Sequence, residues 1–505
     1  MRRRVLVGAV AFAGLMAVGL AYSTGAFDRF DEAWFLAVVS RVRHGDVLYR
    51  DVWYGAGPLP VYLTEAATWL VGVEILAVKL VVVAAFAASA LLAWLIARRL
   101  DIPPLARVVV VAAMAYFSPA IPLSAYGPLS ESFVLATLLA ALVWQERRGR
   151  AGRGVPLLAG GAAAALAFAS KQNVGAYALV ALLVVVAADT RTIARAVRPV
   201  GLVAAGFLAT SFLTLLPTLV TGGFGTYVRR GFTGKTTYVH YSSLSYENAV
   251  QSYFRSLRDI HTEAAAEAAY WATAILLPIL AGIAVVAVLA AWRRLDRRAI
   301  AVLAFALVGF ASLYPLGDAP HVVNASGPLV IVCAYALRLW LPHVSRRVGL
   351  GAVVGLAAWL GVAVLLTAVR PLRLMHSPSA NLSSLPHMHG TFVEVAKEEE
   401  YRRDAETLAA AARGLHGPLF LLMPDASFRY LTSGLKNPTS YDYPIVTTFG
   451  PHGQDRVRDL LASGRIRNVC YGWWTAGLVP TELVSYVRSS MKQGRDLGPC
   501  TLYTR

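Results

Sequence analysis

The stretch ILAVKLVVVAAFAASALLAWLIA, residues 75–97, is followed directly by Arg98 and Arg99. It is long enough to cross a bilayer as one helix, because such a helix needs about 20 mostly apolar residues. The two arginines mark one side of the membrane, since cytoplasmic loops carry an excess of Lys and Arg. The sequence therefore predicts a membrane-spanning helix here that ends in the cytoplasm.

Similar apolar runs follow one another along most of the chain. A first run at 5–22 comes directly after Arg2, Arg3 and Arg4. The others lie at about 105–117, 129–144, 155–170, 176–188, 199–220, 266–292, 299–316, 322–341 and 348–369. Together they predict a mainly α, polytopic transmembrane helical bundle of about eleven helices.

Basic clusters fix the predicted orientation of this bundle. Alternating the helix ends places every cluster on the cytoplasmic side, with the N-terminus inside and the C-terminus outside. The clusters after the first helix are Arg98-Arg99, Arg147-Arg148-Gly149-Arg150, Arg191/Arg195/Arg198, Arg293-Arg294 with Arg297-Arg298, and Arg346-Arg347. An alternative for the run at 5–22 is a cleaved signal peptide, with Ala21-Tyr22-Ser23 as the small-residue site. Both alternatives place the next segment outside, and we favour a retained helix.

Composition supports a membrane protein and argues against a nucleic-acid-binding one. The chain has 505 residues, of which 57% are hydrophobic and 15% are charged. Charged residues supply about a quarter of an ordinary soluble domain. The formal net charge of +18 lies in clusters at the ends of apolar runs, not on a basic stripe with interleaved aromatic residues. We therefore expect a multi-pass protein of the cell (plasma or inner) membrane, with membrane lipids as partners and no nucleic acid.

Three longer segments face outward in this topology: 23–73, 221–263 and 371–505. Because the last alternates helix-like and strand-like runs, we expect residues 371–505 to form a C-terminal extracytoplasmic α/β domain. Residues 1–370, which hold the apolar runs, form the expected transmembrane domain. The strand-like runs are 419–423 and 466–471, with helical stretches at 393–412 and 454–463. Cys470 and Cys500 lie in this domain, and the sequence leaves open whether they form a disulfide or remain free thiols. Cys333 lies in a membrane helix and is expected to serve packing.

The first outward segment carries a concentration of acidic and aromatic residues. Asp31 and Glu32 begin an amphipathic stretch, and Asp51 follows in a region that includes Trp53 and Tyr54. An acidic pair in a loop is ordinarily solvated surface. Trp and Tyr concentrate at membrane interfaces, and a carboxylate held there is partly desolvated, which raises its pKa toward the range useful for a general base. Both interpretations stay open on the sequence alone.

Further ionisable residues occur where apolar helices reach the same predicted face. Each has an ordinary explanation, because short loops need polar residues and a lysine can snorkel. They are Glu131, Lys171, Asp318 and His321. Ionisable residues near membrane depth are nevertheless candidates for function. Their common side predicts a convergent site on the outer face.

The ordered set of these motifs resembles the GT-C superfamily of membrane glycosyltransferases. It is most similar to the bacterial branch related to protein O-mannosyltransferases and lipid A aminoarabinose transferases. The motifs are Asp31-Glu32, Gly45-Asp46, Tyr49-Arg50-Asp51, Tyr54-Gly55-Ala56-Gly57-Pro58, Ser170-Lys171-Gln172-Asn173-Val174-Gly175, Asp318-Ala319-Pro320-His321 and Asn437-Pro438-Thr439-Ser440-Tyr441-Asp442. The chain departs from the branch at Leu316, where the family form has Arg, so the resemblance supplies no arginine for the donor phosphate there.

The resemblance implies transfer of a sugar, with inversion, from a polyprenyl-phosphate carrier to an envelope acceptor outside the cytoplasm. It implies Asp31 as general base, with Glu32, Asp51 and Glu131 as assisting carboxylates. The donor phosphate needs cations, and the candidates are Lys171, His321, Arg229, Arg230, Lys235 and Arg255. Asp318, in the same motif as His321, is a further candidate for donor binding. The acceptor is a glycan, a lipid or a protein. No cofactor is expected, and a divalent metal shared among the carboxylates is compatible with the spacing but not required by it.

Two other classes of function compete with this one. A transporter or flippase of a lipid-linked envelope precursor would carry ionisable residues at mid-membrane, broken helices and internal repeats. The helix middles of this sequence carry almost no charge, and no repeat is evident. A non-catalytic scaffold for envelope assembly is the third class, and the sequence alone does not distinguish it.

Overall fold

The computed structural model describes residues 2–25, 27–117, 124–147, 152–190, 192–233, 262–314, 319–343, 351, 354–356, 358, 361–362, 369, 371–449, 452–474 and 478–505. The chain divides into two compact units. Unit 1 comprises Met1–Ser23, Val82–Leu215 and Leu244–Leu372, and unit 2 comprises Thr24–Val81, Leu216–Ser243 and Arg373–Arg505. The tail after residue 372 therefore shares a compact unit with the first loop, while the domain boundary near residue 370 stays a prediction from the sequence.

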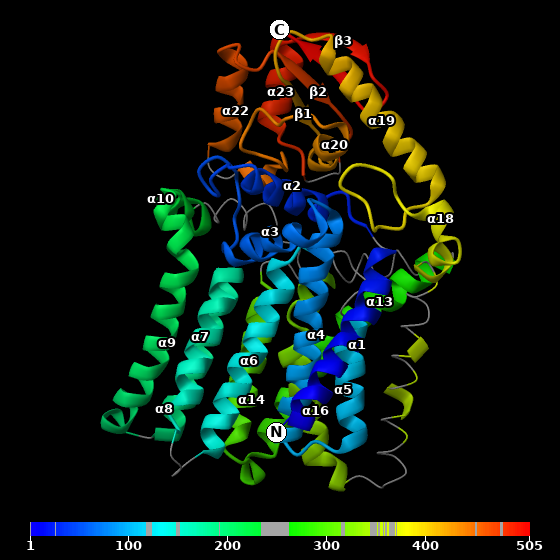
Figure 1. Cartoon of the computed structure of the whole chain (residues 1–505). Coiled ribbons are helices and arrows are strands. Elements are labelled where there is room, and N and C mark those ends of the chain that lie inside the picture. The colour runs from blue at the N-terminus through cyan, green and yellow to red at the C-terminus, as the bar shows by residue number, and fades with distance from the viewer. Residues whose placement is uncertain are drawn as a thin grey trace. The chain divides into compact units, whose positions relative to one another are not determined.

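Unit 1 is helical, and several of its helices run side by side (Figure 1). The apolar helices are α1 (Arg2–Thr24), α4 (Ile75–Arg99), α5 (Pro104–Phe117), α6 (Tyr126–Glu146), α7 (Val155–Ser170), α8 (Gln172–Thr190), α9 (Ile193–Val220), α13 (Thr262–Ala290), α14 (Arg298–Ser312) and α16 (Ser326–Trp340), with the short α15 (Ala319–Val323) before α16. Each predicted apolar run up to residue 341 coincides with one of these helices or with the α15–α16 pair. The prediction of a polytopic helical bundle is therefore confirmed, while the run at 348–369 lies largely outside the described residues.

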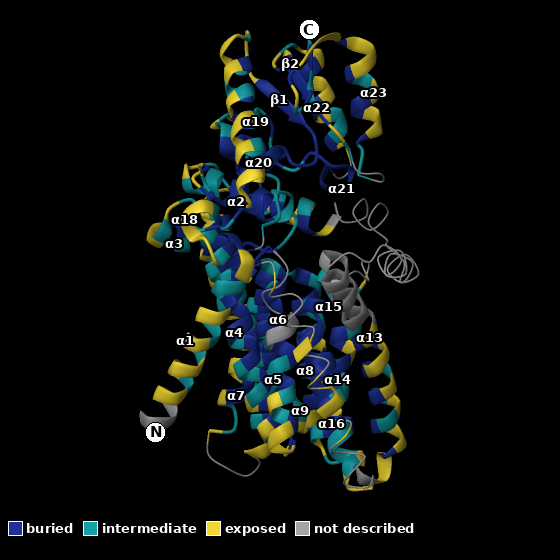
Figure 2. Ribbon diagram, turned by 90° about the vertical axis from the view of Figure 1, so that its right-hand side faces the viewer, coloured by how far each residue is buried: buried dark blue, intermediate teal, exposed yellow. Residues whose placement is uncertain are grey.

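Length and composition identify the helices that suit a membrane. Among the described residues, five helices are long and apolar enough to cross one: α1 from Leu6, α4, α6, α8 and α9. Shorter apolar helices occur at Pro104–Met114, Val155–Ser170, Leu276–Ala290 and Arg298–Ser312. The apolar window of α6 is 72% buried, whereas those of α1 and α9 are 11% buried (Figure 2). Helix α6 is thus enclosed by protein on most sides, which matters because it carries Glu131.

Small residues allow the helices of unit 1 to approach closely. A Cβ added at Gly161 of α7 would collide with the backbone oxygen of Val203 in α9. A Cβ added at Gly206 of α9 would collide with the backbone oxygen of Leu158 in α7. Close backbone approach of this kind is how helices associate in lipid, where burial of apolar surface gives no driving force. The glycines therefore fix α7 against α9.

Arginines at several described helix ends form ion pairs that join these ends within unit 1. Arg298, at the start of α14, donates to Asp101, which follows α4, at 2.9 Å. Arg99 of α4 pairs with Glu146 at the end of α6. Arg153 donates to Asp189 at 2.9 Å and thereby joins the start of α7 to the end of α8. These helix ends lie together, as the alternating assignment of the basic clusters requires.

Unit 2 combines the first loop with the C-terminal segment. Its helices are α2 (Asp31–Arg43), α3 (Leu59–Val71), α10 (Phe224–Val228), a π-helical turn (Arg229–Thr233), α18 (Pro378–Asn381), α19 (Val395–Arg413), α20 (Ala426–Ser433), α21 (Val446–Phe449), α22 (Gly453–Ala462) and α23 (Thr481–Ser490). Its strands are β1 (Leu419–Leu422), β2 (Asn468–Tyr471), β3 (Lys492–Asp496) and β4 (Thr501–Thr504). The prediction of a small α/β domain in the tail is confirmed.

The four strands form one sheet in the order β1-β2-β4-β3. Strands β1 and β2 are parallel, with Phe420 opposite Val469, and β4 runs antiparallel to both β2 and β3. Alternate residues of β1 point to opposite faces of the sheet. Leu419 and Leu421 pack with α19 and α20, while Phe420 and Leu422 pack with α22 and α23. Helices therefore cover both faces of the sheet.

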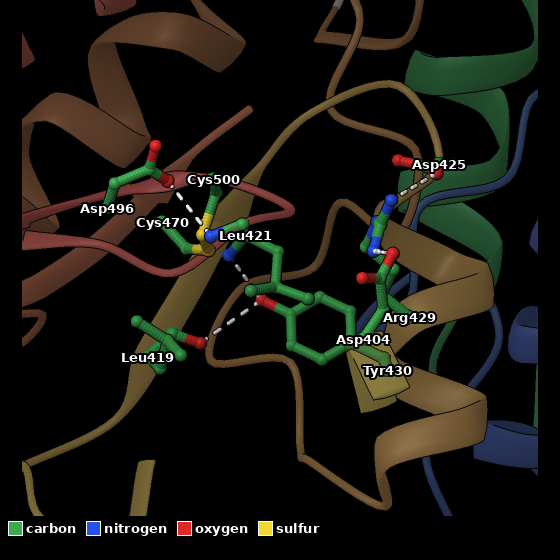
Figure 3. Close-up of a disulfide and its surroundings, with 10 residues drawn as sticks. Asp404, Leu419, Leu421, Asp425, Arg429, Tyr430, Cys470, Asp496 and Cys500 are labelled. Atoms are coloured by element: carbon green, nitrogen blue, oxygen red, sulfur yellow. Dashed lines mark hydrogen bonds and ion pairs between the residues drawn. A yellow bond between two sulfur atoms is a disulfide. The ribbon is translucent and has the colours of Figure 1, made fainter. Parts of the chain in front are cut away.

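Polar contacts also hold β1 against α20 (Figure 3). The hydroxyl of Tyr430 donates to the backbone oxygen of Leu419 at 3.2 Å and accepts from the backbone nitrogen of Leu421 at 2.8 Å. Arg429 on the same helix lies between Asp425 and Asp404, at 3.2 Å and 2.7 Å. Because Tyr430 is buried, its two hydrogen bonds satisfy a hydroxyl that burial would otherwise penalise. The buried carboxylate of Asp425 has the charge of Arg429 beside it as an ion pair.

A disulfide joins Cys470 of β2 to Cys500, just before β4 (Figure 3). The two Cα atoms are 5.5 Å apart. The structure thus adopts one of the two alternatives that the sequence left open. The bond closes a loop across 30 residues that includes α23 and β3.

We expect the replacement of both Cys470 and Cys500 by alanine to lower the free energy of unfolding of unit 2. A cross-link over a loop of this length restricts the unfolded chain by about 2–4 kcal/mol. Thermal unfolding of the purified double variant, compared with wild type, measures the loss. The control is Cys333→Ala, which removes a thiol that takes part in no disulfide. An equal effect of the two changes would contradict the prediction.

Candidate active site

The start of α2 in unit 2 presents the acidic pair that the sequence singled out. The carboxylate of Asp28 accepts hydrogen bonds from the backbone nitrogens of Phe30 at 2.9 Å and Asp31 at 3.0 Å. It therefore satisfies two donors that a helix start would leave unpaired. Burial raises the pKa of Asp28. Asp31 begins the helix, half-buried, in a position fixed by this capping contact.

Glu32, the next residue, points into the protein and meets a lysine. Its carboxylate oxygens lie 3.2 Å and 3.3 Å from Nζ of Lys79, and the second also accepts the backbone N–H of Asp28 at 3.2 Å. Both side chains are almost completely buried, at 2% and 1% exposure. Burial raises the pKa of Glu32 to about 7, and Lys79 opposes this shift. That pKa suits a general base, but a side chain enclosed to this degree offers no access to an acceptor hydroxyl.

Arg41, near the end of α2, connects the first loop to the C-terminal segment. Its guanidinium donates to Asp46 at 2.7 Å, to the backbone oxygen of Thr439 at 2.8 Å, and to the backbone oxygen of Asp51 at 3.0 Å. It also pairs with the buried carboxylate of Asp442 at 3.2 Å. One side chain thus holds three segments of unit 2 together.

The Asn437–Asp442 segment, which carried part of the family resemblance, forms a closed turn. Asn437 accepts from the backbone nitrogen of Thr439 at 2.9 Å and donates to Asp442 at 2.9 Å. The backbone nitrogen of Trp53 donates to the oxygen of Ser440 at 2.7 Å. The segment therefore serves as a docking point for the first loop within unit 2.

Asp51 is occupied by its neighbours. Its carboxylate accepts from Arg50 at 3.0 Å and 2.9 Å and from the backbone nitrogen of Val47 at 2.9 Å. The hydrogen bond from Arg50 is the main reason that the pKa of Asp51 is lowered. A carboxylate whose charged form is stabilised in this way is a weak base. The lowered pKa makes Asp51 a poorer candidate for proton abstraction, while Asp31 stays the base predicted from the sequence.

The segment after α9 contributes cations and tyrosines to unit 2. Arg230 donates to the backbone oxygen of Val52 at 3.2 Å, and Arg229 is exposed and donates to Thr226. The ring of buried Tyr227 lies 4.9 Å from that of Tyr49. Lys235 and Arg255 lie outside the described residues.

The predicted residues of unit 1 lie around the start of α6. Lys171, between α7 and α8, places its Nζ 6.0 Å from the ring of Tyr126, the first residue of α6. Glu131, five positions later, accepts hydrogen bonds from Ser326 and from the backbone nitrogen of Gly327 at the start of α16. His321 lies in α15, which leads into α16. Asp318 and Leu316 lie outside the described residues.

Glu131 has the geometry of a helix cap. One carboxylate oxygen receives both hydrogen bonds from the α16 N-terminus, where the helix dipole favours negative charge. The other oxygen is buried and finds no hydrogen-bond partner among the described residues. Gly127 permits this arrangement, because a Cβ there would collide with Asn324 of the α15–α16 connection. Glu131 thus fixes the segment that carries His321.

The site residues therefore form two groups, one in each unit. Unit 2 holds Asp31, Glu32, Asp51, Arg229 and Arg230, and unit 1 holds Glu131, Lys171 and His321. Sequence analysis missed Lys79 and Arg41. Lys79 had a detectable signal, since a lysine inside an apolar run invites a search for its partner. No group of three His, Cys, Asp or Glu side chains suited to a metal ion occurs within the described ranges.

The Glu32–Lys79 pair gives a prediction about stability. Replacing one partner removes the opposite charge that the pair supplies to the other buried group, and breaking a buried ion pair in this way costs about 3–5 kcal/mol. We therefore expect Glu32→Gln and Lys79→Met each to lower the melting temperature of the purified protein. The double variant, which removes both charges, should be more stable than either single variant.

The pH dependence of Lys79→Met provides the control for this prediction. Because the pKa of Glu32 is raised to about 7, the folded state binds this proton more readily than the unfolded state. The stability deficit of Lys79→Met should therefore shrink as the pH falls from about 8 to about 5. Two results would contradict the pairing. One is a double variant whose loss of melting temperature equals the sum of the two single losses. The other is a stability deficit of Lys79→Met that does not change with pH.

Comparisons with known proteins were made on both sequence and structure. No protein-family model matches the chain, and no curated protein matches it by sequence. Solved structures do resemble it. ArnT from Cupriavidus metallidurans bound to undecaprenyl phosphate has a TM-score of 0.55 and 14% identity, and the match covers 99% of this chain and 97% of that one.

Two further structures show the same similarity. An Archaeoglobus fulgidus oligosaccharyltransferase in complex with Zn and sulfate has a TM-score of 0.51 and 11% identity, over 91% of this chain and 68% of that one. The mycobacterial arabinofuranosyltransferase AftD has a TM-score of 0.51 and 15% identity, over 100% of this chain and 40% of that one. At these identities the similarity establishes the fold.

Proposed function

Because the chain has the GT-C glycosyltransferase fold shared by these structures, we propose that it is an inverting membrane glycosyltransferase. It takes a sugar from a polyprenyl-phosphate carrier and transfers it to an envelope acceptor on the outer face of the cell membrane. The observation that carries the proposal is the match over almost the full length of a protein bound to undecaprenyl phosphate. The two groups of site residues support it, since the reaction needs both a base and cations.

The orientation in this proposal rests on the arginine-rich end of unit 1. If that end is cytoplasmic, as the positive-inside rule requires, the start of α6 belongs to the outer side. The disulfide between Cys470 and Cys500 supports an extracytoplasmic position for the tail, because disulfides persist in oxidising compartments.

A lipid-linked donor suits this architecture. The donor phosphate gains charge as the glycosidic bond breaks, and a positioned cation stabilises that charge. Lys171, with its Nζ near the ring of Tyr126, is the cation that we assign to this role, together with His321, Arg229 and Arg230. Lys235, Arg255 and Asp318 complete the donor-binding proposal from the sequence.

We expect the purified protein to transfer sugar from polyprenyl-phosphate donors and not from nucleotide sugars. The assay presents a panel of polyprenyl-phosphate hexoses and pentoses, and separately their nucleotide-sugar counterparts, with envelope extract as acceptor. Direct turnover of a nucleotide sugar in the absence of any lipid carrier would contradict the proposal. Movement of the lipid-linked sugar across vesicles without transfer would instead support a flippase.

Asp31 is the proposed general base. It accepts the proton of the acceptor hydroxyl as that oxygen attacks the sugar carbon and the carrier phosphate leaves. Removal of a general base typically costs about 10²–10⁴-fold in rate. Asp31→Asn should show this loss in single-turnover transfer, with donor binding and melting temperature unchanged.

The matched control for Asp31→Asn is Asp455→Asn. Asp455 is a half-buried carboxylate on α22, paired with Arg458 at 2.7 Å, and its loss should leave the rate unchanged. A near-normal rate for Asp31→Asn would transfer the role to Asp51 or Glu131.

A further inference from the structure

A cavity of about 1170 Å³ lies at the arginine-rich end of unit 1. Its walls come from the start of α7, the end of α8, the start of α9 and the turn that precedes α14. Helices α8 and α9 are both long and apolar enough to span a membrane. The cavity therefore lies at the level where membrane helices reach the polar head groups of the lipid.

The polar lining of this cavity carries excess positive charge. Its charged residues are Arg153, Arg195, Arg198, Arg297 and Asp189. The carboxylate of Asp189, only 2% exposed, lies 2.9 Å from Arg153 and 3.6 Å from Arg297. A single buried carboxylate thus holds two arginines in place at the cavity wall.

Arg195 and Arg198 have a different environment. Both are exposed on the first turns of α9, and neither forms an ion pair with a described residue. They lie one turn apart, so their side chains project from the same side of the helix. Among the residues that the structure describes, the cavity therefore offers two guanidinium groups without an ion-pair partner, and a guanidinium matches the geometry of a phosphate.

The remaining walls of the cavity are apolar. Leu157, Leu158, Pro199 and Leu202 line it, together with Trp144, whose ring lies 4.9 Å from the guanidinium of Arg153. A cavity with cations on one part and aliphatic side chains on another matches a molecule with a charged head and an apolar tail. A soluble phosphate would use only the first part.

We propose that this cavity binds an anionic membrane phospholipid, with the head-group phosphate on Arg195 and Arg198 and the acyl chains against the leucines. The positive-inside rule accounts for arginines at helix ends, but it does not account for a cavity lined by them. Basic pockets between membrane helices are a recognised means of holding acidic head groups. The proposal is independent of the transferase activity and of Asp31.

Native mass spectrometry of the full-length protein in detergent tests the proposal, with phosphatidylglycerol as the anionic probe and phosphatidylcholine as the zwitterionic one. The wild-type protein should retain phosphatidylglycerol in preference to phosphatidylcholine. The double variant Arg195→Gln/Arg198→Gln should bind phosphatidylglycerol about thirtyfold more weakly, from roughly fivefold for each arginine. Glycerol phosphate, which has the head-group charge but no acyl chain, should fail to displace the lipid.

The matched control is Arg98→Gln/Arg293→Gln. It removes two exposed arginines from the same end of unit 1, and neither lines the cavity. This variant should bind phosphatidylglycerol as wild type does. An equal loss in both double variants would show that only surface charge matters, and no loss in either would overturn the site.

Two measurements keep the test informative if a variant folds poorly. A melting temperature identifies that case, and the wild-type preference between the two lipids does not depend on any variant. Displacement of phosphatidylglycerol by glycerol phosphate would mean that the arginines bind a free anion, which would also overturn the lipid assignment.

Discussion

The buried ion pair between Glu32 and Lys79 constrains the catalytic end of unit 2. A carboxylate without a partner in this environment would be strongly penalised, so α2 must place Glu32 toward Lys79. Successive side chains on a helix diverge by about 100°. Fixing Glu32 inward therefore turns Asp31 to another side, half-buried at the helix start, where Asp28 also holds its backbone nitrogen. The direction of the proposed base therefore depends on the buried pair that its neighbour forms.

At the start of α6, too, one residue positions a segment that carries another candidate site residue. Glu131 binds the N-terminus of α16 through Ser326 and Gly327, so its charge stabilises a helix connection in an enclosed part of the bundle. That connection follows α15, which carries His321. A lost carboxylate at position 131 would therefore disturb His321 indirectly, and a loss of activity there would not by itself identify Glu131 as a base. Only a proton-transfer readout separates the two roles.

The sequence predicts the bundle well because the physical signal is long and repetitive. Apolar length and arginine clusters are properties of single segments, and the helix ends that carry Arg99, Arg153 and Arg298 do meet. Parts of the tail have no such signal. Strand β3 is exposed along its whole length and has the sequence Lys-Gln-Gly-Arg-Asp. It has no alternation of apolar and polar residues from which a strand could be predicted. The position of β3 comes from pairing with β4.

The candidate site was predictable only as a set of residue types. The order of residues does not reveal which charged groups form ion pairs. Lys79, the partner of Glu32, lies 47 residues away in the sequence, and Asp442, a partner of Arg41, lies 401 residues away. Those partners affect the chemistry of each carboxylate. Arg50 stabilises the ionised form of Asp51, and Lys79 forms a buried ion pair with Glu32. Glu131 accepts a hydrogen bond from the N-terminus of α16. Three of the four candidate carboxylates thus have a structural task besides any part in proton transfer. The assignment of the base to Asp31 therefore rests on its place at the start of α2 and on the resemblance of its motif.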